Sequence, residues 1–367
     1  MVPSGTLTRP RRWPALFNYG FRPFFLLASI WAVLAVIAVI IAPHIGLAAG
    51  AWHAREMIFG FGSAVLAGFL LTAVPTWTGR VPLDNAALLG LVALWALGRT
   101  GVAVDLPVLD LLFLPALFIA IGWTLVRARR WRAFKVAAAL PVLFLAQIGF
   151  LAEDVLPAMD RHFLALAAYG WLIAIVGGRL LGHLTDGPKH DGLDHLTLVL
   201  LLPALAAWAL ADPPWPLRLL MAIAGLAVLL RQTRWRPFRS MDTITLALQL
   251  AHAMLGFSLL ASAAGAAPGL VAHLFALGAM SLAMMAAMIR MASRFLQKPV
   301  LAGQSVALVI AAAAVRVGAE VLPGLQATLL AVSGLFWLLA HASFLRRYGM
   351  ALFGLAPKEV RSSRAVI

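Results

Sequence analysis

The chain contains no cysteine and little charge. None of its 367 residues is Cys, and only 12% are Asp, Glu, Lys or Arg. Without cysteine there can be no disulfide, no thiolate metal site and no cysteine-ligated iron–sulfur cluster, so any bound metal must use His, Met, carboxylate or backbone ligands. The shortage of charge excludes a soluble globular protein, because too few polar side chains remain to cover its surface.

Apolar residues dominate what is present. They make up 63% of the chain, and its mean hydropathy is +0.94. This composition predicts a polytopic membrane protein whose main partner is the lipid bilayer. The formal net charge of +15 could suggest a nucleic-acid partner, but the positive residues stand in short clusters between apolar runs, as in cytoplasmic loops of membrane proteins. We therefore expect no nucleic-acid partner.

Apolar runs separated by Pro, Gly and charged residues predict an all-α bundle of about twelve transmembrane helices. The runs lie near 24–43, 53–75, 86–103, 109–127, 134–152, 163–182, 195–211, 216–231, 242–264, 270–293, 303–321 and 325–346. The first is of full span length and no cleavage site interrupts it, so we expect it to be retained. The predicted organisation is an interfacial N-terminal segment (1–23), one transmembrane domain (24–346) and a cytoplasmic tail (347–367).

Charge alternates along this layout. With a cytoplasmic N-terminus, the outer half holds only five cations, which are Arg55, Arg99, Arg161, Arg218 and Arg316. Adding or removing one span would destroy the alternation, so the positive-inside rule predicts an even number of spans with both termini in the cytoplasm. The outer loops are expected to carry acidic residues, namely Asp105, Asp110, Glu153, Asp154, Asp160 and Asp212.

The stretch from Trp52 to Arg80 concentrates the unusual chemistry. It reads as a membrane helix, yet its first turn carries His53, Arg55 and Glu56, which are costly near hydrocarbon and need partners. Small residues follow Glu56 at four-residue steps and form a groove along one helix face, at Gly60, Ala64, Gly68 and Thr72. Such a groove commonly receives another helix, and it could also accept a flat macrocycle.

Two histidines at matched depth are the first candidates for a metal or cofactor site. His53 and His273 each stand in the first turn of a helix that enters from the outer side. Together they could supply both axial ligands of a haem or share a copper ion, although a single histidine there more often makes an interfacial hydrogen bond. His252, near the middle of its span, is the third candidate, and its alternative is a hydrogen bond to a neighbouring helix, through Gln249 or a serine.

Methionines follow His273 along its helix. Met280, Met284, Met288 and Met291 lie near whole turns from it, so we expect them on one face. Thioether sulfur, at Met280 first of all, could bind Cu(I) or haem iron, but methionine is also a common packing residue.

Two further polar clusters have simpler interpretations. Segment 177–195 carries three Asp and three His, which could hold a divalent metal but are more typical of a solvated loop. Arg316 and Glu320 are four residues apart near the outer end of a helix, a spacing that permits a structural ion pair.

Five segments together resemble the NnrS family of bacterial twelve-helix inner-membrane proteins. They are GFRPFFLLASIWAVLAV from Gly20, WHAREMIFGF, GFLLTAVPTWTGR, RHFLALAAYGWLIAIVGGR and HLFALGAMSLAMMAAMIR, within a similarity from about Phe17 to Pro357. The resemblance implies a multi-pass protein of the bacterial inner membrane that contains haem, of b type, and possible copper, and that takes part in the response to nitric oxide and nitrosative stress. It also implies that His53 is the first His of the WHxHE motif, and that His252 and His273 match histidines of the ninth and tenth helices.

The chain departs from the family pattern in two places. Arg55 stands at the second His of WHxHE, and SRFLQKP, residues 293–299, replaces GHTGR. One haem without copper, altered affinity, or a metal-free scaffold would each be consistent with these changes. Arg55 could instead pair with a haem propionate, and Arg55 and Glu56 complete the candidate cofactor-binding set.

The leading hypothesis is a haem-binding membrane protein of the nitric oxide response. The second is a transporter of a metal, haem or a small solute, with Glu56, His252 and the methionines along its path. A haem–copper reductase ranks last, because no two histidines are adjacent and the chain has only three tyrosines. Whether the protein is an enzyme stays open.

Overall fold

The computed structural model describes residues 13–42, 50–81, 83–152, 158–185, 187, 192–235, 242–297 and 303–355, and the structural statements below concern these residues. Within them the chain is helical, and the one β-type pairing is an isolated bridge between Met159 and Leu210. Eleven stretches are long and apolar enough to cross a membrane, and a twelfth, α10 (Gly192–Trp208), is shorter. The prediction of an all-α polytopic membrane bundle is confirmed, including the short seventh span.

The first half of the chain supplies five spans. In order, its elements are η1 (Ala15–Asn18), α1 (Phe21–Ile41), α2 (Gly50–Arg55), η3 (Glu56–Gly62), α3 (Ser63–Thr78), α4 (Asn85–Ala103), η4 (Pro107–Leu112), α5 (Phe113–Arg127), η5 (Trp131–Ala133), α6 (Phe134–Ala137) and α7 (Ala139–Leu151). The stretch α2–η3–α3 is one continuous span, and it is the most buried span of the molecule.

The second half supplies the other seven. Its elements are α8 (Arg161–Leu172), η7 (Ile173–Gly177), α9 (Gly178–Leu184), α10, α11 (Trp215–Thr233), α12 (Thr243–Ala263), α13 (Pro268–His273), η8 (Leu274–Ser281), α14 (Leu282–Phe295), α15 (Gly303–Val321), η9 (Pro323–Leu325) and α16 (Gln326–Phe353). The spans α8–η7–α9 and α13–η8–α14 are continuous, as α2–η3–α3 is.

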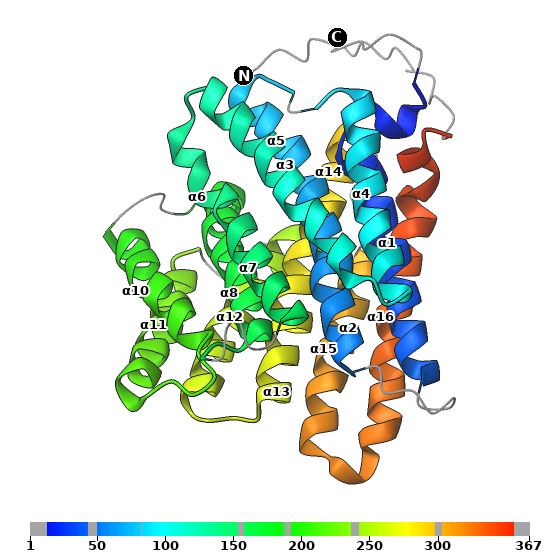
Figure 1. Ribbon diagram of the computed structural model, residues 1–367. Helices are drawn as coiled ribbons and strands as arrows, with labels where there is room; N and C mark the ends of the chain where they lie inside the picture. Colours follow the sequence, from blue (N-terminus) through cyan, green and yellow to red (C-terminus); the bar gives the residue numbers. More distant parts are fainter. Residues whose placement is uncertain are drawn as a thin grey trace, which may run out of the picture.

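The two ends of the chain are packed together. In Figure 1, α1 and α16 run side by side at one flank of the bundle, whereas α10 and α11 form the opposite flank. Trp337 of α16 donates its indole N–H to the backbone oxygen of Ala32 in α1, at 3.0 Å. This contact joins residues that are 305 positions apart, so the last span closes the bundle against the first.

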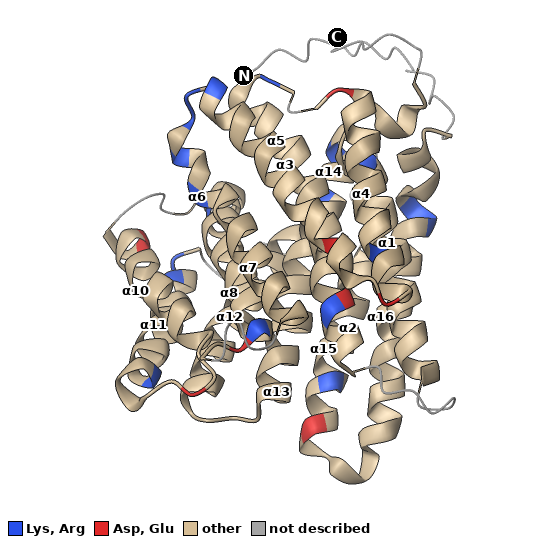
Figure 2. Ribbon diagram, viewed as in Figure 1, with Lys and Arg blue, Asp and Glu red and all other residues tan. Residues whose placement is uncertain are grey.

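Both ends of the described chain lie at the same end of the bundle. The Cβ position of Gly354, after α16, is 3.4 Å from Nη1 of Arg22, and Tyr19 packs against Phe295 at the end of α14. We call this the inner end; α2 and α13 begin at the opposite, outer end (Figure 1). In Figure 2, several Lys and Arg segments gather toward the inner end, in agreement with the positive-inside rule.

Three buried spans contain π-helical segments, η3, η7 and η8. Such segments are rare, and they often occur at functional sites. They contact one another's spans: Tyr169 of α8 donates its hydroxyl to the backbone oxygen of Ile58 in η3 at 2.9 Å, and the Cβ position of Gly62 lies 3.1 Å from Cε of Met280 in η8. The middle of the bundle is therefore built from these three irregular spans.

Candidate functional site

A network of four buried charges surrounds the head of the second span. Nη1 of Arg99, in α4, lies 2.7 Å from Oε2 of Glu56, and its Nη2 contacts Oδ1 of Asp110 in η4. Arg55 approaches the other oxygen of Asp110 at 3.3 Å. All four residues are buried, with Glu56 at 0% exposure. Because two guanidinium groups face two carboxylates, the charges balance within the bundle.

Neutral donors complete this network. Trp31 of α1 donates its indole N–H to Oε2 of Glu56 at 2.7 Å, and Gln147 of α7 donates to the backbone oxygen of Asp110 at 3.2 Å. Arg55 also donates to the backbone oxygen of Pro107 at 3.2 Å. The guanidinium of Arg55, for which pairing with a haem propionate was one alternative, is thus held by Asp110 and Pro107.

The sequence misplaced one member of the network, Asp110, and indicated no partner for another, Arg99. Asp110 was expected in an outer loop, but it is 2% exposed within η4, and Arg99 was read only as one of the few outer cations. A loop position was wrong for Asp110 because Arg99 and Arg55 compensate its charge inside the bundle. One feature of the sequence could have predicted this burial. Asp110 is an ionisable residue at the edge of an apolar run, and such a residue usually has a buried partner of opposite charge.

His53 and His273 lie in the same region of the outer end. They belong to α2 and α13; His53 is within electrostatic range of His273, and both are within electrostatic range of Arg316 of α15. Nδ1 of His273 is 2.8 Å from the backbone oxygen of Gly269, which leaves its Nε2 as the nitrogen that can bind a metal. Nδ1 of His53 is buried and has no hydrogen-bond partner within the described residues.

The ion pair between Arg316 and Glu320 is confirmed. Nη1 of Arg316 lies 2.7 Å from Oε1 of Glu320, and both side chains are partly buried. Glu320 also lies beside α13, since the Cβ position of Gly269 is 3.7 Å from its Oε1. The pair therefore brings a cation and an anion to the border of the His53–His273 site.

His252 is fully buried elsewhere in the bundle. Its Nδ1 lies 2.9 Å from the backbone oxygen of Leu248 in its own helix. The ring also lies within hydrogen-bonding range of the backbone of Ile173 in η7, so a bond to a neighbouring element, one of the two interpretations of this histidine, stays open. Its ring stands edge-on to Trp235, with centroids 5.3 Å apart, and contacts η7, where the Cβ position of Gly177 is 2.7 Å from its Cε1. Neither His53 nor His273 is among these contacts, so His252 lies apart from the His53–His273 site.

The segment 177–195 is less loop-like than expected. Residues 178–184 form α9, and α10 begins at Gly192, so both ends of the segment are helical. Asp194 is buried and lies 2.8 Å from Nε of Arg231, whose Nη1 donates to the backbone oxygen of Ala174 in η7. Other acidic and histidine residues of this segment and of the expected outer loops lie outside the described residues, namely Glu153, Asp154, Asp186, His190 and Asp191.

His341 is a buried histidine that the sequence pattern did not single out. It is 1% exposed, and both ring nitrogens have no hydrogen-bond partner among the described residues. Its ring packs between Trp337 and Phe61, with centroid separations of 4.5 and 5.2 Å. The sequence predicts a position toward the cytoplasmic side of the last span, and no pattern of neighbouring residues indicated that this histidine is buried.

The groove of small residues is filled by α1. An added Cβ at Gly68 would lie 2.7 Å from ring atoms of Phe25, and one at Gly60 would clash with Trp31. Both aromatic residues come from α1. The structure therefore shows helix packing in this groove, which was one of its two expected uses.

The methionines line an inner cavity only in part. Met280, Met284 and Met288 are all buried, and Met280, Met284 and Met291 contribute to the walls of a cavity of about 1630 Å³. The expectation of one face shared with His273 assumed regular α-helical turns, but η8 intervenes between His273 and Leu282. His273 lies at the outer end, away from this cavity.

Comparison with known proteins gives one family. A family model described as NnrS protein matches residues 15–355, which is nearly the whole chain. Neither a curated protein nor a solved structure gives a significant match.

Proposed function

Because this chain belongs to the NnrS family of membrane proteins, we propose that it binds haem between His53 and His273 and serves in the bacterial response to nitric oxide. The observation that carries the proposal is the buried Nδ1 of His53, which has no hydrogen-bond partner within the described residues and lies in the electrostatic range of His273. Coordination to a metal ion or to haem iron would give that nitrogen a bonding partner. On this proposal, the protein would lie in the bacterial inner membrane.

The donor set fits haem better than a metal ion held by side chains alone. In the described ranges, no three His, Asp or Glu side chains gather so that they could hold a metal ion. Haem would need few ligands from the protein, and the imidazoles of His53 and His273 are the residues that would hold it. Bound haem would provide an iron centre to which nitric oxide can coordinate.

The neighbouring residues would orient such a ligand. The backbone oxygen of Gly269 fixes the ring of His273 through Nδ1, so that Nε2 is presented. Arg316, held by Glu320, lies within electrostatic range of both histidines and would pair with a carboxylate at the outer end. Arg55 and Glu56 would act indirectly, because their network with Arg99 and Asp110 fixes the beginning of the span that carries His53.

The test is an absorption spectrum of the detergent-purified protein, oxidised, reduced, and reduced with nitric oxide, together with iron and copper analysis. We expect a Soret band that shifts with nitric oxide and is lost in both His53→Ala and His273→Ala. His162→Ala is the matched control, since this outer histidine bonds to Asp160 instead. Folded wild-type protein without iron, or an equal loss of the band in His162→Ala, would contradict the proposal.

Transport is the second candidate, and the inner cavity favours it. A cavity of about 1630 Å³ that reaches the buried Met280 and Met284 could hold a solute part-way across the bundle. If the protein carries copper or haem, uptake into proteoliposomes should fall in Met284→Ala and persist in Met350→Ala, an exposed methionine of α16. Equal uptake in liposomes with and without the protein would remove this candidate.

A further inference from the structure

The large cavity lies in the inner half of the bundle, far from the paired histidines. Its walls come from α3, α6, the stretch α8–η7–α9 and α14. Phe295, at one edge, packs against Tyr19 beside η1, which places the opening at the inner end. At this depth the head groups of the inner leaflet would surround the protein.

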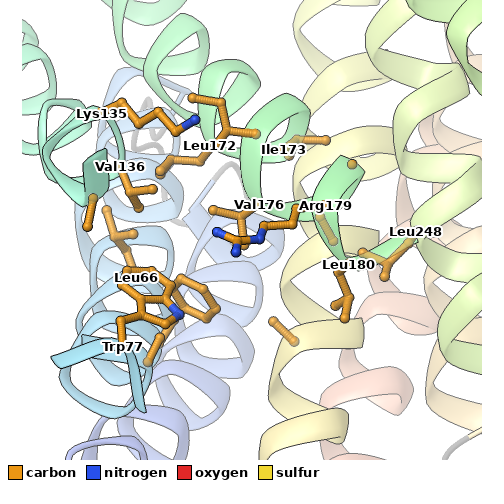
Figure 3. Close-up of a pocket in the computed structure, with 18 of the residues that line it drawn as sticks. Leu66, Trp77, Lys135, Val136, Leu172, Ile173, Val176, Arg179, Leu180 and Leu248 are labelled. Carbon is orange, nitrogen blue, oxygen red and sulfur yellow. The ribbon is translucent and has the colours of Figure 1, made fainter. Parts of the chain in front are cut away.

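The deep walls of the cavity are apolar. Figure 3 shows Leu66 of α3 facing Leu172, Ile173 and Val176 of the α8–η7 stretch across the open space. Met284 closes the cavity from the side of α14. A hydrocarbon chain would be compatible with these walls, whereas a small hydrophilic anion would leave them solvated.

Cations from three separate segments line the same cavity. The connection between α5 and α6 contributes Arg129, Arg130 and Arg132, and α6 itself contributes Lys135. In Figure 3, Lys135 stands at one edge, and Arg179 extends from α9 into the open space.

The end of α14 completes this ring with two further cations, Arg290 and Arg294. Asp194 is the one carboxylate among the described lining residues, and Arg231 already neutralises it at 2.8 Å. None of the other seven cations forms an ion pair in the described part of the chain. Asp242 lies within electrostatic range of Arg290, but it does not line the cavity. The lining of the cavity therefore carries a net positive charge.

The positive-inside rule explains why cations lie on this side of the membrane, but not why they surround one cavity. Arg346 and Arg347 of α16 are exposed cations of the same membrane side, and neither lines it. Apolar walls beneath a basic rim select a ligand that is both hydrophobic and anionic. We propose that this cavity binds an anionic phospholipid of the inner leaflet, with its acyl chain against α3 and η7 and its phosphate among Arg179, Arg290 and Arg294.

Known chemistry supports this choice of ligand. Guanidinium groups bind phosphate oxygens in a bidentate manner, and basic pockets between helices on the cytoplasmic side bind anionic head groups. Trp77, in the wall, and the exposed Trp131, at the rim, are side chains typical of the membrane interface.

The test compares lipid retention by the full-length purified protein in native mass spectrometry. The delipidated protein is titrated with phosphatidylglycerol, phosphatidylethanolamine or inorganic phosphate. We expect saturable retention of one phosphatidylglycerol, at least tenfold stronger than retention of phosphatidylethanolamine. The double variant Arg179→Gln/Arg294→Gln should lose about tenfold or more of this affinity, whereas Arg346→Gln/Arg347→Gln, with the same loss of charge on the same side, should keep it.

A second variant tests the apolar half of the site. Ala287→Trp places a large side chain in the wall of α14 while leaving every cation in place, and it should also release phosphatidylglycerol. Equal effects of the two double variants would show attraction by surface charge alone and overturn the proposal. Displacement of the lipid by equimolar inorganic phosphate, or by equimolar haem, would overturn it too, because the cavity would then be a site for a free anion or for haem.

Discussion

Arg99 holds together charges that come from three helical elements. Its two Nη atoms contact Glu56 of η3 and Asp110 of η4, while the residue itself belongs to α4 and is 4% exposed. Removing one member of a buried ion network leaves an uncompensated charge, which costs more than the net stabilisation by the intact network. The guanidinium of Arg99 is therefore the group on which the local stability depends most.

Arg99→Gln should strongly destabilise the protein. The change leaves Glu56 and Asp110 with only Arg55 as a cationic partner, and breaking such a buried network costs about 3–5 kcal/mol. Thermal unfolding in detergent would measure the effect as a lowered midpoint. Arg218→Gln is the control, because its ion pair with Asp212 is exposed and should contribute about 1 kcal/mol or less. Midpoints that fall equally in the two variants would refute the role given to Arg99.

Asp160 predicts a pH dependence at the start of α8. Partial burial raises the pKa of its carboxyl, but hydrogen bonds from His162 and from the amides of His162 and Phe163 outweigh burial and hold the pKa below its ordinary value. A lowered pKa in the folded state means that the carboxylate stabilises the protein at pH values above about 3.9, the ordinary value for Asp. This contribution is lost as the pH falls from there through the lower folded-state pKa.

Two substitutions at this position separate capping from titration. Asp160→Asn keeps a capping side chain and should make the acid side of the stability curve flatter, with little loss at pH 7. Asp160→Ala should lower the free energy of unfolding at pH 7 by about 0.5–2 kcal/mol, since the cap is lost. Unfolding midpoints between pH 3 and pH 7 would show both effects, and an unchanged acid slope in Asp160→Asn would count against the linkage.

At the scale of elements, the second span combines close packing with an irregular backbone. Its small residues admit the aromatic side chains of α1, and in its π-helical part the backbone oxygens of Ile58 and Gly60 accept hydrogen bonds from Tyr169 and Trp95. These contacts tie the span to α1, α4 and α8. A helix so constrained can hold His53 in a fixed position at its outer end.

Gly68→Ala should lower the stability of the protein, because α1 and α3 pack closely at this position. The new Cβ would lie 2.7 Å from Phe25, so α1 and α3 must separate, and overpacking of this kind costs about 1–3 kcal/mol. Gly90→Ala on α4 is the matched control, because its Cβ position has no atom within 4 Å and the change should be neutral or slightly stabilising. The midpoints of thermal unfolding of the two variants measure the difference. An unchanged midpoint in Gly68→Ala would mean that α1 packs less closely against α3 than described.

At the scale of the whole molecule, twelve spans return the chain to the membrane side from which it began. The packing of α16 on α1 and the approach of Gly354 to Arg22 bring the two ends of the described chain together. An odd number of crossings would separate them by the thickness of the bilayer. The arrangement agrees with the even number of spans that the charge bias predicts, and the same bias predicts that both ends are cytoplasmic.

Reporter fusions test this orientation. A green fluorescent protein joined after Leu355 should fluoresce, whereas alkaline phosphatase at the same point should be inactive, because it folds only outside the cytoplasm. Alkaline phosphatase inserted after Leu322, between α15 and α16, should be active. The reverse pattern would invert the topology and place the paired histidines on the cytoplasmic side.

The sequence by itself determined the bundle. Spans are encoded locally, because a run of about 20 apolar residues must satisfy its own backbone hydrogen bonds within the bilayer, and the loop charges then set the orientation. Local spacing was also sufficient for the Arg316–Glu320 pair, which lies within one helix turn. The family, too, was recognisable from short segments such as those that begin at Gly20 and Trp52.

Only the tertiary structure decided which polar residues meet. Arg55, Arg99 and Asp110 come from three elements, so no spacing rule connects them, and their burial depends on mutual compensation of charge. The π-helical segments likewise depart from the regular turns that helical periodicity assumes, so the spacing from His273 to the methionines does not by itself define a shared helix face. The basic cavity arises from cations of distant segments, and such convergence exists only once the helices have packed.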